Sequence, residues 1–498
     1  YELYRDGDLI ATIGSGENSN YVDASGTMDS VYTVKAVIDG VTYQACDPVY
    51  VWGDQYLQVD LKKPEPYYDE HLTETYEYSP NDTNVADADG DGEYELFVKW
   101  DALSQDNSKS GFTAPVYIDC YKLDGTLLWR VNLGINIRAG AHYTQFQVFD
   151  FDGDGKAEMI CKTADGTVDG AGNVIGDADA DWRNGSGYIL DGPEYLTLFD
   201  GETGEALDTI DYDPPRGNVN SWGDAYGNRV DRFLAGVAYL DGEHPSAIFA
   251  RGYYTRAVVC AYDVVDDKLV QRWKIDSNDA GNEDLYGQGA HSLTTADVDN
   301  DGCQEVVYGS ATIDHDGTLM YSLGAAGAGY GGHGDAQRVS DFNLKNPGQE
   351  IFMVHESHPW NAGIEMHDGA TGEYVFAFPT NADTGRGASG DIDPRYEGAE
   401  SWAIGMNDWD TREGKMITQD GEVIGNTIPA ANFMIWWDGD LGREILDHEF
   451  VDNGTDYYPV SVHIAKWDWE NEQQVNILEP EGLYSNNGTK GNPCFQAD

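Results

Sequence analysis

The stretch VADADGDGEYELFVKWD (residues 85–101) joins an acidic, glycine-containing loop to a run of large apolar residues. The same order returns in FDFDGDGKAEMICK (149–162) and in ADVDNDGCQEVVYG (296–309). Aspartates at alternate positions aim carboxylates at a common centre, and the glycine permits the tight turn. The apolar run that follows is typical of a buried strand. The repeat therefore predicts short strands separated by acidic turns.

A second repeated feature is a hairpin in which Asp-Gly separates two apolar runs, which is a strong hairpin signal. It occurs in the ranges 121–134, 198–210, 312–324 and 366–378. Acidic loops precede such units and begin at Asp87, Asp150, Asp297, Asp341 and Asp391, with a weaker one near Asp241. Helical periodicity is almost absent. The recurrence predicts a β-propeller made of four-stranded units that carry insertions.

Buried strands are predicted at the ranges 96–100, 158–162, 247–250, 305–309 and 350–355, each rich in β-branched or aromatic residues. The first 60 residues differ, because YELYRDGDLIATI (1–13) and SVYTVKAVIDG (30–40) read as hairpin-forming segments. They are typical of part of a fibronectin-III-like sandwich. We therefore predict a partial sandwich over residues 1–60 and a calcium-binding propeller over residues 61–498, whose last blade is incomplete.

The acidic loops are predicted to bind calcium, which prefers hard oxygen ligands in a flexible loop. An ordinary polar turn explains one such loop, but three full copies favour metal binding. The full copies contribute Asp87, Asp89, Asp91 and Glu95; Asp150, Asp152, Asp154 and Glu158; and Asp297, Asp299, Asp301 and Glu305. Two degenerate copies contribute Asp341, Asn343 and Glu350, and Asp391, Asp393 and Glu400.

The charge balance limits the partners of the chain. Its 89 Asp and Glu against 29 Lys and Arg give a formal net charge of −60, which disfavours nucleic acid and anionic membranes. This acidity is either a solvated surface or a set of metal ligands. No apolar run is long enough to span a membrane. The six cysteines contain no CxxC pair, so zinc or thioredoxin-like chemistry is not expected, and disulfide pairing cannot be read from spacing.

Four glycine-rich segments carry unusual polar residues. They are GQGAHS with His291, GGHGDA with His333 and Asp335, TGRGASGD with Arg386, and SNNGTKG with Asn487, Thr489 and Lys490. Each alone has a structural reading, such as a hydrogen-bonded buried histidine, a solvated arginine or a surface turn. Together they are candidates for a convergent polar site.

Longer segments identify a family. The chain resembles family 11 polysaccharide lyases, the bacterial rhamnogalacturonan lyases. The segments that carry the resemblance are YSPNDTNVADADGDGEYELFVKWD, NIRAGAHYTQFQVFDFDGDGKAEM, GQGAHSLTTADVDNDG, GRGASGDIDPRY, NFMIWWDGDLGRE and SNNGTKGNPC. The resemblance runs along the whole chain and implies an all-β fold, an eight-bladed propeller with a central cleft. It implies cleavage of the rhamnose–galacturonate bond of the pectin rhamnogalacturonan I backbone by calcium-assisted β-elimination, which leaves an unsaturated galacturonate end.

The resemblance also implies roles for particular residues. The cleft would be lined, partly around an active-site calcium, by Asn81, Asp101, His291, Asp297, His333, Asp335, Asn487, Gly488 and Thr489. Arg386 and Lys490 would face the substrate, with Lys490 as the candidate base and His291 and His333 as further catalytic candidates. Family members continue beyond the point at which this sequence ends. Loops at 323–332 and 402–421 are of the kind that cap a cleft and favour exolytic cleavage. We nevertheless predict endolytic rather than exolytic cleavage.

Two other classes of function share some of these features. A non-catalytic calcium-propeller that binds carbohydrate or mediates adhesion would carry the same acidic loops but would not need the glycine-rich polar segments. A hydrolase would need two positioned carboxylates, which so acidic a chain can supply. If the chain is a lyase, we expect a secreted, extracellular protein whose partner is rhamnogalacturonan I. Additional carbohydrate-binding or anchoring modules outside this chain are compatible with that function.

Overall fold

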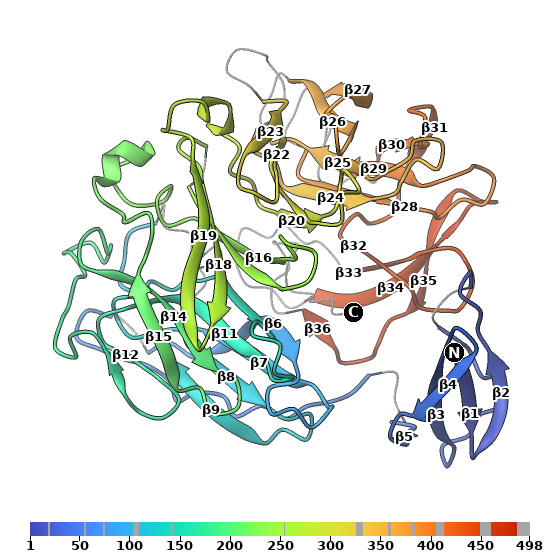
Figure 1. The fold of residues 1–498 in the computed structure, drawn as a ribbon, viewed down its shortest axis with the longest axis horizontal. Coiled ribbons are helices and arrows are strands. Elements are labelled where there is room, and N and C mark those ends of the chain that lie inside the picture. Colours follow the sequence, from blue (N-terminus) through green and yellow to red (C-terminus); the bar gives the residue numbers. More distant parts are fainter. Residues whose placement is uncertain are drawn as a thin grey trace.

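The computed structural model describes residues 1–17, 20–53, 56–72, 75–102, 109–140, 143–252, 254–324, 332–356, 360–380, 384–404, 413–448 and 460–485. In these ranges the chain forms eight antiparallel β-sheets (Figure 1). The helical content of the same ranges is two short 3-10 turns, Val219–Trp222 (η1) and Glu283–Leu285 (η2). The predicted all-β class is confirmed.

The N-terminal sheet stands apart from the rest in topology. Its strand order is β2-β1-β3-β4, and β5 pairs with β3. The strands are β1 (Glu2–Arg5), β2 (Asp8–Thr12), β3 (Val31–Ile38), β4 (Val41–Ala45) and β5 (Val49–Tyr50). Met28 and Val51 from this region line a cavity of about 430 Å³ together with Glu479, Pro480 and Glu481. The N-terminal sheet therefore lies against the end of the chain's last described sheet.

The other seven sheets each contain four strands in chain order. Sheet one has β6 (Ser79–Ala86), β7 (Glu95–Asp101), β8 (Tyr117–Tyr121) and β9 (Leu127–Asn132), extended by β12 (Thr167–Val168) and β13 (Val174–Ile175). Sheet two has β10 (Phe146–Phe149), β11 (Glu158–Ala164), β14 (Glu194–Asp200) and β15 (Ala206–Asp211). Sheet three has β16 (Phe233–Ala238), β17 (Ser246–Arg251), β18 (Val258–Val265) and β19 (Lys268–Asp276).

The remaining sheets repeat this plan. Sheet four has β20 (Leu293–Ala296), β21 (Glu305–Tyr308), β22 (Ala311–Ile313) and β23 (Leu319–Ser322). Sheet five has β24 (Ala336–Ser340), β25 (Glu350–Val354), β26 (Trp360–Asp368) and β27 (Tyr374–Thr380). Sheet six has β28 (Arg386–Gly390), β29 (Glu400–Ile404), β30 (Glu413–Ile417) and β31 (Val423–Thr427). Sheet seven has β32 (Phe433–Ile435), β33 (Glu444–His448), β34 (Val460–Asp468) and β35 (Gln473–Leu478), and β36 (Tyr484–Ser485) pairs with β34.

The first strands of successive sheets contact one another in chain order, from β6 through β10, β16, β20, β24 and β28 to β32. Figure 1 shows the sheets following one another around the molecule, from blue at β6 to red at β35. The apolar core lies between neighbouring sheets, because Phe97 of sheet one clusters with Met159 of sheet two. In the same way Leu198 of sheet two clusters with Phe249 of sheet three. Each small sheet thus buries its faces against its neighbours.

The Asp-Gly hairpins also fasten one sheet to the next. A Cβ at Gly204, in the hairpin between β14 and β15, would lie 2.7 Å from the indole of Trp129 on β9. The same indole donates a hydrogen bond to the carbonyl of Gly201 at 2.8 Å. In the same way, a Cβ added at Gly317 would lie 2.7 Å from the indole of Trp273. The glycines of these turns are therefore required both by the positive φ of the backbone and by the aromatic ring that packs on them.

Several predictions of local structure are confirmed. The five predicted buried strands correspond to β7, β11, β17, β21 and β25, and the four Asp-Gly hairpins join β8 to β9, β14 to β15, β22 to β23 and β26 to β27. Cys120, Cys161 and Cys260 are buried free thiols, and Cys494 lies outside the described residues. Within the described part of the chain, no helix has the length and apolar character needed to cross a membrane.

Candidate active site

The acidic loops connect the first strand of a sheet to the second and are built by backbone hydrogen bonds. In the loop between β6 and β7, the carboxylate of Asp87 accepts from the N–H groups of Gly90 at 2.7 Å and Gly92 at 2.9 Å. Glu95, the first residue of β7, accepts from the N–H of Ala88 at 2.7 Å. The same closure is made by Glu158 with Phe151 at 2.9 Å and by Glu305 with Val298 at 2.8 Å. Each sequence-predicted glutamate thus locks its loop.

The remaining oxygens of these loops face one another. Asp150, Asp152 and Glu158 each offer an oxygen within 4.8 Å of the others, and burial together with the neighbouring carboxylates raises the pKa of Glu158 to about 8. In the loop between β20 and β21, Oε1 of Glu305 is buried without a hydrogen-bond partner. Clustered carboxylates of this kind fit a divalent cation with oxygen ligands.

A lysine already supplies positive charge in two of the loops. Nζ of Lys122 lies 2.7 Å from Asp89, 2.9 Å from Asp91 and 3.4 Å from Glu95. Lys466, on β34, makes the equivalent contacts with the loop between β32 and β33, an acidic loop that the sequence reasoning missed. It contacts Asp438, Asp440 and Glu444 at 2.6, 2.5 and 3.1 Å. The loop of Asp150 therefore fits a calcium ion better than the loop of Asp87.

The two degenerate loops satisfy part of their polar groups internally. Asp393 pairs with Arg395 at 2.6 Å. Asn343 donates its side-chain amide to the carbonyl of Gln419 at 3.3 Å. Glu350 and Glu400 close these loops by accepting backbone N–H groups, as the other glutamates do. Metal binding by Asp341, Asn343, Asp391 and Asp393 stays a prediction.

A second cluster forms at the opposite ends of the first strands, where these strands begin. His291 precedes β20, His333 and Asp335 precede β24, and Arg386 is the first residue of β28. The structure brings them together, because Oδ1 of Asp335 lies 3.3 Å from Nε2 of His291. Its other oxygen, Oδ2, lies 3.5 Å from Nη1 of Arg386. The rings of His291 and His333 meet edge to face with centroids 4.9 Å apart.

His333 is held in one orientation. Its Nδ1 lies 2.7 Å from the carbonyl oxygen of Gly289, and a carbonyl can only accept, so Nδ1 carries the hydrogen. Its Nε2 lies 2.5 Å from Oε2 of Glu356. Two atoms with lone pairs approach this closely only when a proton or a metal cation lies between them. His291, His333, Asp335 and Glu356 together place one ligand atom each within 4.8 Å of the others.

This group fits a divalent cation, although its ligands are mixed. The carboxylates of Asp335 and Glu356 supply the oxygens that calcium prefers, whereas the imidazoles of His291 and His333 suit a wider range of metals. Burial raises the pKa of Glu356, but the hydrogen bonds and charges of His333, Tyr254 and Arg232 outweigh burial and lower it. Glu356 is therefore kept as an anion that can hold a cation.

Sequence reasoning missed Glu356 and Tyr254. Tyr254 donates a hydrogen bond to Glu356 at 2.6 Å, and its ring lies 4.3 Å from that of His333. Glu356 follows β25, the second strand of its sheet, just as Asp101 ends β7, the second strand of sheet one. A polar residue at the end of a buried second strand is the signal that would have found Glu356.

Asn81 and Asp101 form a pair on the first sheet. The amide of Asn81 donates to Oδ2 of Asp101 at 2.7 Å. Burial raises the pKa of Asp101 to about 6, helped by the charge of Asp82 and opposed by Lys99 and Asn81. Lys99 is buried beside them and contacts Asp82 at 2.9 Å. This corner of the molecule thus combines a weakly acidic carboxyl group with a buried ammonium group.

Two sequence-based placements need comment. The resemblance implied that Asp297 lines the cleft; the structure places it in an acidic loop, at the opposite end of β20 from His291. The reason is that an extended strand separates its ends by about 3.3 Å per residue. Asn487, Gly488, Thr489 and Lys490 lie outside the described residues, as does the loop segment 405–412.

Comparisons with known proteins agree on one family. A family model described as "Rhamnogalacturonan lyase family 11, C-terminal domain" matches residues 56–498. A second, described as "Rhamnogalacturonan I lyases beta-sheet domain", matches residues 1–52. The chain is 52% identical over 500 residues to rhamnogalacturonan exolyase YesX of Bacillus subtilis, covering 100% of this chain and 80% of the relative. It is 49% identical to rhamnogalacturonan endolyase YesW of the same species, covering 100% of this chain and 76% of the relative.

Solved structures give the same result. The crystal structure of the exotype rhamnogalacturonan lyase YesX superposes with a TM-score of 0.89 at 51% identity, covering 99% of this chain and 80% of that one. The structure of a Bacillus licheniformis rhamnogalacturonan lyase superposes with a TM-score of 0.86 at 50% identity, covering 98% of this chain and 79% of that one. The described fold is therefore that of these lyase structures.

Proposed function

The chain belongs to rhamnogalacturonan lyase family 11 and is a rhamnogalacturonan lyase, and from this premise we propose that it breaks the rhamnose–galacturonate bond of rhamnogalacturonan I by calcium-assisted β-elimination. The observation that supports this chemistry is the convergence of Arg386, His291, His333 and Asp335 at the start of neighbouring first strands. These residues join a guanidinium, two imidazoles and carboxylates in one place, which suits a substrate that carries a carboxylate.

The first task of the site is to neutralise the substrate carboxylate. The hydrogen at C5 of galacturonate is weakly acidic, because an adjacent carboxylate resists further negative charge. Arg386 is placed to bind that carboxylate, since its guanidinium is fixed by Asp335 and by donation to the carbonyl of Gly385 at 2.6 Å. A charge contact at 4 Å contributes about 4 kcal/mol at an effective dielectric near 20. That energy corresponds to roughly a thousandfold in rate if it is made in the transition state.

The second task is proton removal. A base takes the C5 proton, the electron pair forms the C4–C5 double bond, and the C4–O bond breaks. The oxygen leaves with rhamnose and takes up a proton. Lys490 is our proposed base, carried over from the resemblance, and it lies outside the described residues. His291 is the proposed group for the proton that the leaving oxygen needs, because its ring lies beside Asp335, whereas both ring nitrogens of His333 are engaged by Gly289 and Glu356.

The third element is a divalent cation, which we propose to be calcium. Asp335, Glu356 and His333 would hold it, and the close approach of His333 to Glu356 supports a cation or proton at this point. Such an ion would supply positive charge to the substrate carboxylate. Further calcium ions in the acidic loops would stabilise the fold, with the loop of Asp150, Asp152 and Glu158 as the best candidate.

We also propose that the seven described chain-ordered sheets are blades of an eight-bladed β-propeller, and that residues 1–60 form part of a fibronectin-III-like domain. The succession of contacts from β6 to β32 supports the propeller. The single described N-terminal sheet, β2-β1-β3-β4 with β5, supplies strands for one layer of a sandwich. A secreted, extracellular location is proposed because the polymeric substrate of such a lyase lies outside cells.

The direct experiment is to incubate the protein with rhamnogalacturonan I and follow ultraviolet absorbance. β-Elimination creates a carbon–carbon double bond conjugated to the carboxylate, which absorbs, whereas hydrolysis creates none. Absorbance must rise with each bond broken, and new reducing ends without absorbance would reject the proposal. Endolytic cleavage stays a prediction, because the relatives include an exolyase and an endolyase. A fast fall in viscosity at low conversion would establish endolytic cleavage, and accumulation of one small product would establish exolytic cleavage.

A further inference from the structure

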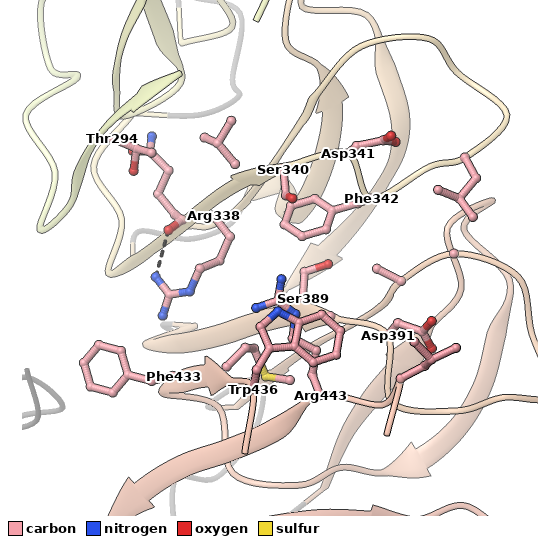
Figure 2. A pocket seen from close by; sticks show the side chains of 18 residues that line it. Thr294, Arg338, Ser340, Asp341, Phe342, Ser389, Asp391, Phe433, Trp436 and Arg443 are labelled. Atoms are coloured by element: carbon pink, nitrogen blue, oxygen red, sulfur yellow. Dashed lines mark hydrogen bonds between the residues drawn. The ribbon is translucent and has the colours of Figure 1, made fainter. Parts of the chain in front are cut away.

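A cavity of about 880 Å³ lies along the first strands β24, β28 and β32 (Figure 2). Its lining runs from Gln337 and Phe433, near the starts of β24 and β32, to residues at or just past the strand ends, such as Ser340, Gly390 and Trp436. Neither Arg386 nor Asp335 is among its lining residues. Its volume falls in the range of sites that hold small molecules. The lyase mechanism described above makes no use of it.

The cavity contains a guanidinium without an acidic partner in the described part of the chain. Arg338, on β24, donates to the carbonyl oxygens of Gln337 at 2.8 Å and Asn432 at 2.5 Å. Burial and the charge of Arg386 lower the pKa of Arg338 to about 10, and no carboxylate of the described residues offsets this. Arg338 is half-buried, and a cation that is partly removed from water is costly to keep unless an anion compensates it.

A second arginine and an aromatic ring form another wall. The guanidinium of Arg443 lies 4.4 Å from the centre of the Trp436 ring, and both side chains line the cavity, as Figure 2 shows. Trp436 is 42% exposed. An indole ring offers a flat apolar face of the kind that packs against the C–H face of a sugar, and a guanidinium binds a carboxylate through two parallel hydrogen bonds.

Hydrogen-bond acceptors complete the lining. Asp341 and Asp391, which are also predicted metal ligands, follow β24 and β28 and face the cavity from the side opposite Phe433 in Figure 2. Ionised carboxylates only accept hydrogen bonds, so they favour a ligand that presents hydroxyl groups to them and disfavour a ligand with several negative charges. The ligand that matches this wall has one carboxylate, several hydroxyl groups and an apolar face.

We propose that this cavity is a second carbohydrate site that binds a galacturonate-bearing oligosaccharide, with Arg338 and Arg443 toward its carboxylate and Trp436 against its ring. The class of ligand rests on the proposed function, because galacturonate is the acidic sugar of the substrate and of its products. The site would hold a chain end away from the reaction centre, and it takes no part in bond breakage.

The test is calorimetric titration of the intact protein with galacturonosyl-rhamnose, a disaccharide that has no group at O4 to eliminate. Wild-type protein binds two equivalents. Arg443→Gln and Trp436→Ala weaken the second equivalent by at least about tenfold, because each removes a wall of the cavity. Trp437→Ala is the matched control, since Trp437 is equally exposed at 43% but does not line the cavity. It keeps both equivalents.

Lyase rates on rhamnogalacturonan I separate this proposal from the proposed function. All three variants retain the wild-type rate. A stoichiometry of one in wild-type protein with full lyase activity overturns the second site alone. So does a second equivalent that Arg443→Gln and Trp436→Ala leave unchanged. Equal second-site binding of galactosyl-rhamnose, which lacks the carboxylate, overturns recognition by the two arginines. Absence of lyase activity in the wild-type protein rejects the proposed function instead.

Discussion

Asp335 and Arg386 meet across two neighbouring strands, with Oδ2 of the carboxylate 3.5 Å from Nη1 of the guanidinium. The other carboxylate oxygen lies 3.3 Å from Nε2 of His291. One carboxylate therefore orients a cation at the start of β28 and an imidazole before β20. Both partners are proposed to contact the substrate, so Asp335 acts as a positioning residue as well as a candidate ligand for the cation.

Replacing Asp335 by Asn removes the charge that holds these two groups. We expect kcat/KM on rhamnogalacturonan I to fall by roughly 10- to 100-fold, mainly in kcat, because geometry in the transition state is lost. Steady-state kinetics measures this effect. Asp263→Asn is the matched control, since Asp263 pairs with Arg272 at 3.4 Å on strands β18 and β19. Equal kinetic constants for the two variants would show that Asp335 positions nothing.

Removal of calcium separates two kinds of site. A chelator should abolish activity and lower the melting temperature together. In Glu356→Gln, half-maximal activity should need roughly tenfold more calcium, because a ligand of the proposed active-site ion is lost. In Asp152→Asn, the melting temperature should fall while kcat at saturating calcium stays unchanged, because that loop is proposed to be structural. Calcium titrations of activity and thermal melts check both. Full turnover by wild-type protein in chelator contradicts the metal assignment.

The buried carboxyl group of Asp101 predicts a pH dependence of stability. Burial raises its pKa to about 6 from 3.8, so between these values the folded state binds more protons than the unfolded state. The free energy of unfolding therefore decreases as pH rises, by about 3 kcal/mol over the full range for this group. Wild-type protein should lose stability relative to Asp101→Asn as pH rises from about 4 to about 7, and urea denaturation measures this difference.

Asp276 provides a control of opposite sign. Burial raises its pKa, but the hydrogen bond and charge of Arg256 outweigh burial and lower it. Its stabilising contribution is therefore present above the unfolded pKa and is lost as pH falls through the folded pKa. Relative to Asp276→Asn, wild-type protein should lose stability only on acidification below about pH 4. A relative stability of Asp101→Asn that does not change with pH would refute the burial argument.

The packing of Trp273 on Gly317 predicts a large effect of a single methyl group. Gly317 has φ +87°, and an added Cβ would lie 2.7 Å from the indole. Gly317→Ala should therefore lower the free energy of unfolding by about 2–4 kcal/mol, combining backbone strain with overpacking. Gly172→Ala is the control, because Gly172 has φ +89° and an added Cβ would meet nothing within 4 Å. This variant should therefore be destabilised by backbone strain alone. Equal destabilisation of the two variants would exclude a fastening role for the ring.

The regular parts of the fold could be predicted because they are encoded locally. The acidic loop after β6 and the Asp-Gly turn between β8 and β9 are each specified by a few adjacent residues, and strands follow from the apolar runs between them. The pairing of β12 with β9 could not be predicted, because Val168 lies in the chain between β11 and β14 of sheet two yet pairs with Asn132 of sheet one. The acidic loop at Asp438 was missed because its aspartates stand in a shortened pattern.

The candidate site was predictable in part. His291, His333, Asp335 and Arg386 stood out because charged residues between glycines are unusual, and the structure brings these four together. Glu356 did not stand out, because its contact with His333 joins the residues that flank two different strands, β24 and β25, and leaves no mark in local spacing. The contacts of Asp335 with His291 and Arg386 are likewise tertiary contacts, which local sequence spacing does not reveal. The catalytic role of Lys490 stays a prediction.

The central claim is that positive charge on the substrate carboxylate makes the C5 hydrogen removable, and Arg386→Gln tests it most directly. The measurement is the initial rate of ultraviolet-absorbing product from rhamnogalacturonan I at saturating calcium, with Arg272→Gln as a surface control. We predict a loss of roughly a hundred- to a thousandfold for Arg386→Gln, from a contact of about 3–4 kcal/mol, and no loss for the control. An undiminished rate in Arg386→Gln would contradict the account.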